Sequence, residues 1–211
     1  MNILTTIIMC YSYEASINAF IFNLIIIVII LNRNNYHDKW MSLFIASYAF
    51  VQLGEGLIWK HYNTNKRLKD LGLFIIMVCL ILQPIIQSLG GYLFSEYKIL
   101  YLVAILFGLS AFLMIDVEES KRNLTIGETK HLSWSNYYKN KLYENIHFYY
   151  YGIFMIVPLL TLKDFPAKNP LIIYGLGSLI YSYYNYYKTK EFTSFWCYTA
   201  TIYSLVYYIF S

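Results

Sequence analysis

Charged residues are scarce in this sequence. Asp, Glu, Lys and Arg together make up 13% of the 211 residues, whereas apolar residues make up 58% and the mean hydropathy is +0.46. So few charges are not enough to cover the surface of a soluble protein of this size. The composition therefore predicts an integral membrane protein, whose first partner is the lipid bilayer.

Cysteines and clusters of basic residues are also rare. The three cysteines, Cys10, Cys79 and Cys197, lack the spacing of a metal site, and the net charge is a modest +4 without a run of basic residues. We therefore expect no metal, no cofactor and no nucleic-acid partner. A disulfide between Cys10 and Cys197 is geometrically conceivable, because both begin helices at one membrane face. Free thiols are the alternative that we favour.

The sequence is rich in long apolar runs. A helix needs about 20 residues to cross the hydrocarbon core of a bilayer. Seven nearly charge-free runs of about this length cover residues 12–31, 41–59, 71–94, 99–115, 146–162, 171–187 and 192–210. We predict an all-α fold with a single transmembrane domain over residues 1–211, built as a bundle of seven helices. Six helices are the alternative, because Pro158 interrupts the fifth run. The longest loop, 116–145, should contain a hairpin near residues 131–134.

Glu55 is the one acidic residue that lies well inside an apolar run, and no Lys or Arg lies in any run to pair with it. A carboxylate at the centre of a bilayer costs roughly 3 kcal/mol, which favours the neutral acid, and an ionisable residue at this depth is a functional hypothesis by default. The flanking Gly54 and Gly56 allow close packing of helices or the approach of a ligand. The alternative is a protonated, purely structural Glu55 that forms hydrogen bonds with a neighbouring helix.

Two other polar stretches are predicted to lie at the same membrane face as Glu55. In an antiparallel bundle the first run begins, the second ends and the seventh begins at one face, which brings residues 10–16, 51–59 and 192–197 together. The candidate binding residues are Glu55, Gln52, Trp59, Ser12, Ser16, Cys10, Ser194, Trp196, Cys197 and Gln83. The alternative is that the small and polar members of this set only pack helices together.

These stretches resemble the signature of an uncharacterised multi-spanning membrane protein family of bacteria and giant viruses. Residues 9–17 resemble its N-terminal motif, Met-Cys-Phe-Ser-Ala-x-Ala-Ser-Phe, residues 52–59 its Gln-x-x-Glu-Gly-x-x-Trp element, and residues 193–197 its Ser-x-Trp-Cys element. The pair Tyr13-Glu14 departs from the first motif. The resemblance implies seven transmembrane helices and brings no established activity. The composition, rich in Asn, Ile, Lys and Tyr, favours a viral member in a viral or host membrane.

Three functions remain open. We favour binding or transport of a small solute, coupled to a proton through Glu55, over catalysis. The first alternative is a membrane-embedded lipid hydrolase, in which histidines and a carboxylate would hold zinc. His61, His131 and His147 could share the face of Glu55, but no two have the spacing that preforms a metal site on one helix. The second alternative is a non-catalytic assembly or sensor protein of a viral or host membrane.

The orientation in the membrane also stays open. Eleven Lys and Arg residues lie at the face of Glu55 and five at the opposite face, so the positive-inside rule places the Glu55 face in the cytoplasm. The family resemblance implies the opposite orientation. Without the long loop the bias falls to six against five.

Overall fold

The computed structural model describes residues 12–128, 130–133, 138–186, 188–189 and 191–211. Eight helices and one antiparallel pair of short strands form in this part of the chain. The helices are α2 (Tyr13–Arg33), α3 (Asp38–His61), α4 (Lys66–Phe94), α5 (Lys98–Met114), α6 (Val117–Arg122), α7 (Lys141–Thr161), α8 (Lys168–Tyr186) and α9 (Phe192–Phe210). The strands are β1 (Thr125–Ile126) and β2 (Leu132–Ser133).

Each of the seven predicted apolar runs corresponds to one long helix. The helix ends differ from the ends of the runs by at most five residues. Three of these helices, α2, α3 and α4, are long and apolar enough to cross a bilayer, and α5 is a shorter apolar helix. The predicted all-α fold is therefore confirmed, together with three candidate membrane-spanning helices.

Side-chain caps define where several helices begin. The Ser12 hydroxyl accepts a hydrogen bond of 3.2 Å from the backbone N–H of Ala15 at the start of α2, and Asn65 accepts one of 3.2 Å from Leu68 at the start of α4. Such caps satisfy backbone donors that a helix start leaves without partners. Helix α2 ends at Asn34, which adopts the left-handed conformation with φ 55°. A sharp turn therefore leads from α2 directly into α3.

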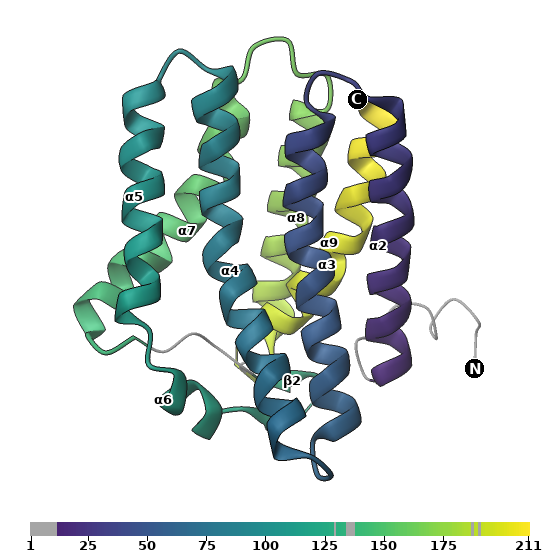
Figure 1. The fold of residues 1–211 in the computed structure, drawn as a ribbon, viewed down its shortest axis with the longest axis vertical. Helices are drawn as coiled ribbons and strands as arrows, with labels where there is room; N and C mark the ends of the chain where they lie inside the picture. Colours follow the sequence, from purple (N-terminus) through teal and green to yellow (C-terminus); the bar gives the residue numbers. More distant parts are fainter. Residues whose placement is uncertain (1–11, 129, 134–137, 187, 190) are drawn as a thin grey trace.

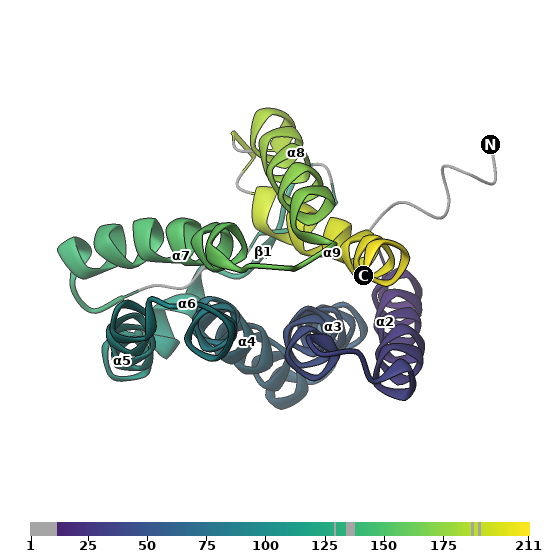
Figure 2. The same cartoon turned by 90° about the horizontal axis from the view of Figure 1, so that it is seen from above.

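The long helices form two layers. Helices α5, α4, α3 and α2 stand side by side in this order, and α7 and α9 pack against them from one side (Figures 1 and 2). Helix α8 packs on α9, away from the first layer (Figure 2). Only Leu171 and Ser182 of α8 are buried. Seen from above, α7 and α8 diverge, so the second layer is less complete than the first (Figure 2).

The long loop contains more regular structure than the sequence predicted. It includes α6, whose first turn is capped by Asp116, and α7 already begins at Lys141 rather than at residue 146. The predicted hairpin is present, with Ile126 paired to Leu132. Leu132 is fully buried in a cluster that includes Ile58 and Cys197. The hairpin therefore covers the end of the bundle at which α3 ends and α9 begins.

Helices α3 and α4 come closest where two glycines face each other. A Cβ atom on Gly54 would lie 2.6 Å from the carbonyl oxygen of Gly72, and one on Gly72 would lie 2.5 Å from that of Gly54. Backbones can approach this closely only where side chains are absent. The sequence left open whether Gly54 serves close helix packing or the approach of a ligand, and its contact with Gly72 favours helix packing.

Gly54→Ala should lower the free energy of unfolding by about 1–3 kcal/mol, because the new methyl group overpacks a contact between two backbones. Thermal unfolding of the purified protein in detergent measures this loss. The control is Gly177→Ala in α8, where no atom lies within 4 Å of the added Cβ. Equal unfolding temperatures for the two variants would contradict the close contact.

A buried carboxylate joins three segments at the opposite end of the bundle. Asp38 is fully buried and accepts hydrogen bonds from Arg33 Nη2 at 2.7 Å and from Arg33 Nε at 3.1 Å. The Tyr207 hydroxyl donates to Asp38 Oδ1 at 2.7 Å. Arg33 Nη1 also donates to the carbonyl oxygens of Tyr208 and Ser211, at 3.1 Å each. The turn between α2 and α3 is thus tied to the last turn of α9.

Asp38→Ala should destabilise the protein by about 2–3 kcal/mol, because it leaves the Arg33 guanidinium without its carboxylate partner. The expected loss is smaller than for a deeply buried pair, since the Arg33 side chain is still 22% exposed. The matched control is Glu96→Ala, which breaks the Glu96–Lys163 pair, whose side chains are 75% and 74% exposed. That control should unfold like the wild type, and an Asp38→Ala variant that did the same would contradict a structural role for the network.

Candidate functional site

Glu55 lies completely buried in α3 and is hydrogen-bonded to α9. Its Oε1 atom accepts a hydrogen bond of 2.6 Å from the Ser194 hydroxyl, which is also fully buried. The two residues are 139 positions apart in the sequence. The second and seventh apolar runs, which the sequence predicted to meet at one face, are thus joined by a direct hydrogen bond between Glu55 and Ser194.

Ser16 and Cys197 lie beside this pair. A Cβ atom on Gly56 would lie 3.7 Å from the Ser16 Cβ, so Ser16 of α2 faces the turn of α3 that carries Glu55. The Ser16 hydroxyl is buried and has no hydrogen-bond partner among the described residues. Cys197 follows Ser194 by one turn of α9, is 1% exposed and carries a free thiol. Glu55, Ser194, Ser16 and Cys197, all candidates from the sequence, are called the Glu55 cluster below.

Of four other predicted residues, the structure describes three, and each has a different environment. Ser12 caps α2 through its hydroxyl, which gives it a structural role. Trp59 packs against the apolar cluster under the hairpin, and its buried indole N–H has no partner in the described part of the chain. Gln52 is fully buried one turn before Glu55. Cys10 lies outside the described residues.

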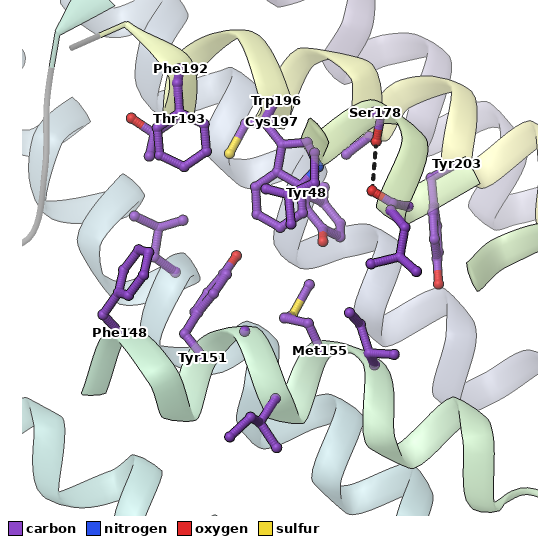
Figure 3. A pocket seen from close by; sticks show the side chains of 18 of the residues that line it. Tyr48, Phe148, Tyr151, Met155, Ser178, Phe192, Thr193, Trp196, Cys197 and Tyr203 are labelled. Atoms are coloured by element: carbon purple, nitrogen blue, oxygen red, sulfur yellow. Dashed lines mark hydrogen bonds between the residues drawn. The ribbon is translucent and has the colours of Figure 1, made fainter. Parts of the chain in front are cut away.

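Gln83 and Trp196 both contact Tyr151, a residue that lines a cavity. The Gln83 side chain of α4 accepts a short hydrogen bond from the Tyr151 hydroxyl of α7. Trp196 packs edge-on against the Tyr151 ring, with 6.1 Å between ring centroids. Sequence reasoning missed Tyr151, because nothing in the run of three tyrosines at residues 149–151 distinguishes one from the others. The structure does distinguish them: Tyr149 is 68% exposed, whereas Tyr151 points inward (Figure 3).

The cavity has a volume of about 630 Å³ and lies between α7, α8 and α9, with α3 on its inner side (Figure 3). The hydroxyl groups of Tyr48 and Tyr151 point toward it, and Trp196 and Cys197 lie on its α9 wall (Figure 3). Most of the other lining residues are apolar or aromatic. Cys197 lines the cavity and follows Ser194, the hydrogen-bond partner of Glu55, by one turn of α9, so the cavity lies about one helical turn from the buried acid.

A third buried acid, besides Asp38 and Glu55, holds the hairpin on the start of α9, and sequence reasoning missed it. Glu191 is fully buried, and its Oε2 atom accepts a hydrogen bond of 3.0 Å from the backbone N–H of His131. A Cβ atom on Gly127 would lie 2.2 Å from the Glu191 carboxyl carbon, so only glycine leaves room for the acid there. The His131 ring packs edge-on against Tyr186 and Phe195. The signal available in the sequence was an acid directly before an apolar run.

The hairpin should detach as the pH falls. Burial lowers the pKa of His131 from 6.5 to about 4, although the Glu191 carboxylate acts to raise it. A folded-state pKa below the unfolded value means that proton uptake favours the undocked hairpin. Docking is therefore most stable above pH 6.5 and weakens as the pH falls from 6.5 toward 4.

Hydrogen exchange of the hairpin amides, compared between variants at one pH, measures this effect. At pH 5 the wild type should exchange faster than His131→Gln, which cannot take up the proton, and at pH 7.5 the difference should vanish or reverse. His61→Gln, at a half-buried histidine near the same face, serves as the control and should behave like the wild type. A wild-type hairpin equally protected at both pH values, after correction for intrinsic exchange, would show that His131 does not govern docking.

The histidines do not gather at one point. His131 lies in the connection between the two hairpin strands, the His147 Nδ1 atom is 2.8 Å from the Tyr138 hydroxyl, and the His61 Nδ1 atom is 3.4 Å from the Thr64 hydroxyl. Within the described ranges, no three side chains of His, Cys, Asp or Glu are grouped so that they could hold a metal ion.

The sequence matches no known family model, no characterised protein and no solved structure at a significant level. The resemblance to the membrane protein family with the N-terminal Met-Cys motif therefore stays a prediction.

Proposed function

We propose that this chain is a seven-helix, multi-pass membrane protein that binds or transports a small solute, with Glu55 as its protonatable group. The outer surfaces of the helices beyond α2–α4 support the membrane assignment. Leu106 and Leu113 of α5 are 59% and 76% exposed, and Ile173 and Ile180 of α8 are 72% and 66% exposed. Apolar surface of this extent is suited to lipid and unfavourable in water.

The observation that carries the functional proposal is the buried hydrogen bond between Glu55 and Ser194 beside a large cavity. In an apolar surrounding the carboxyl group is favoured in its neutral form, and it releases its proton when water or a polar ligand arrives. The charge one helical turn away from the cavity then changes by one unit. If a ligand prefers one of the two states, proton binding and ligand binding are coupled reciprocally.

The hydrolase alternative has less support. His61, His131 and His147 each have separate neighbours, so the described residues do not assemble the ligand set that such an enzyme requires. A sensor or assembly role rests on no particular contact. The stronger competitor is a purely structural Glu55, whose hydrogen bond with Ser194 would only hold α9 on α3. The experiment below is designed to separate these two roles.

Glu55→Gln should retain the fold, because the amide has nearly the same size and keeps an oxygen that accepts from Ser194. Purified protein is reconstituted in liposomes that contain a pH-sensitive dye, and a potassium diffusion potential is applied. Wild type should admit protons faster than protein-free liposomes, and Glu55→Gln should reduce the rate to the protein-free level. Infrared spectra should show a pH-dependent carboxylic acid band that Glu55→Gln lacks.

A matched pair of serine variants provides the control. Ser194→Ala removes the donor to Glu55 and should change the proton flux and the infrared band. Ser204→Ala changes an equally buried serine of α9 whose hydroxyl donates to the carbonyl of Thr201 in its own helix at 2.7 Å, and should change neither. A Glu55→Gln protein with wild-type flux would establish the structural role instead.

A further inference from the structure

We propose that the cavity between α7, α8 and α9 binds one uncharged, single-chain lipid that enters sideways from the bilayer and places a hydroxyl or carbonyl group against Tyr48. This inference names the ligand class for the site proposed above and rests on the membrane assignment made there. It does not depend on proton coupling through Glu55. Four features of the cavity support it: size, charge, hydrogen-bonding groups and opening.

The size and shape fit an extended chain. A methylene group is similar in size to a water molecule, whose share of liquid volume is about 30 Å³. A volume of about 630 Å³ therefore holds roughly 20 such groups, as in a chain of roughly 16 to 18 carbons with a small head group. The lining of α7 extends from Glu144 to Leu159. At a rise of about 1.5 Å per residue this corresponds to about 22 Å. A compact sugar or nucleoside would leave much of this length empty.

The charge of the lining favours an uncharged ligand. No Lys or Arg is present among the described residues that line the cavity. The acid Glu144 lies at its rim, where Lys141 is 3.4 Å away. A phosphate or carboxylate head group inside the cavity would thus lose its hydration without gaining a cationic partner, which is costly in a surrounding of low polarity.

Hydrogen-bonding groups lie midway along the cavity. The Tyr151 hydroxyl donates to Gln83, so its proton is already used. The Tyr48 hydroxyl points toward the cavity and makes no hydrogen bond with any described residue (Figure 3). A hydrogen bond to a buried hydroxyl group stabilises a complex most when no water molecule can act as the partner instead. A ligand hydroxyl or carbonyl oxygen would supply the partner that Tyr48 lacks.

The cavity is open at an exposed surface of α7. Phe148, Tyr149 and Ile153 of α7 line the cavity and are still 65%, 68% and 51% exposed at the outer surface. The two helices diverge on this side (Figure 2). In the proposed bundle this opening faces hydrocarbon, so the ligand arrives from the bilayer instead of from water.

Two glycines of α8 provide a matched test. Gly175 lines the cavity, and the nearest atom to an added Cβ is a ring carbon of Tyr203 at 3.8 Å, so Gly175→Leu would fill the space without a clash. Gly177 has nothing within 4 Å of an added Cβ and lies outside the lining. Gly177→Leu therefore makes the same chemical change in the same helix without occupying the cavity.

The probe is a photoactivatable long-chain alcohol added to the full chain in lipid nanodiscs, with labelled residues located by mass spectrometry. Labels should map to α7, α8 and α9, and excess unlabelled alcohol should compete. The same chain ending in a sulfonate should compete about tenfold more weakly, which corresponds to about 1.4 kcal/mol. Gly175→Leu should reduce labelling about tenfold and Tyr48→Phe to a smaller extent, whereas Gly177→Leu should label like the wild type.

Unfolding temperatures first establish that Gly175→Leu is folded. If it is not, Gly152→Leu fills the cavity from the α7 wall, where an added Cβ meets nothing within 4 Å. If excess unlabelled alcohol does not reduce the labelling, bulk lipid alone fills the space and the proposal is overturned. Equal labelling of Gly175→Leu and Gly177→Leu would overturn it as well. If the sulfonate competed as well as the alcohol, the preference for an uncharged head group would be disproved. The proton-flux result for Glu55→Gln is independent, so either proposal can fail alone.

Discussion

Helix α9 is held against α3 by a buried acid at each end. Near the start of α9, Ser194 donates to Glu55, and near its end, Tyr207 donates to Asp38. In an apolar bundle each of these groups has few alternative partners, and an unsatisfied one is costly. The two contacts therefore fix both the position and the rotation of α9. The cavity, the hairpin and α8 are all placed relative to this helix.

The helices were predictable from the sequence because long apolar runs leave few other structures available. The convergence of Glu55 and Ser194 was also predictable, since antiparallel order alone decides which ends meet. The cavity was not, because it results from the divergence of α7 and α8, and periodicity within a helix contains no information on the angle between two helices. Glu191 was missed because an acid at the start of an apolar run resembles an ordinary solvated loop residue. Its burial depends on Gly127, about sixty residues earlier.

The candidate site thus has two parts of different character. The Glu55 cluster is polar and closely packed, and the hairpin with Leu132 covers the bundle end nearest to it. The neighbouring cavity is large and mostly apolar. Cys197 belongs to the boundary between them. In the function proposed above, this arrangement would separate the protonatable group from the space for the ligand, and a single turn of α9 would connect the two.

The dependence of α8 on α9 has a consequence for biosynthesis. Helix α8 makes its main contacts with α9, which follows it in the chain, and buries only two of its own residues. A ribosome releases α8 first, so this helix is complete before its main partner exists. During that interval its exposed isoleucines and tyrosines have no other helix to pack against, and in the bundle proposed above they would face lipid. The stability of α8 therefore depends on a helix that is made after it.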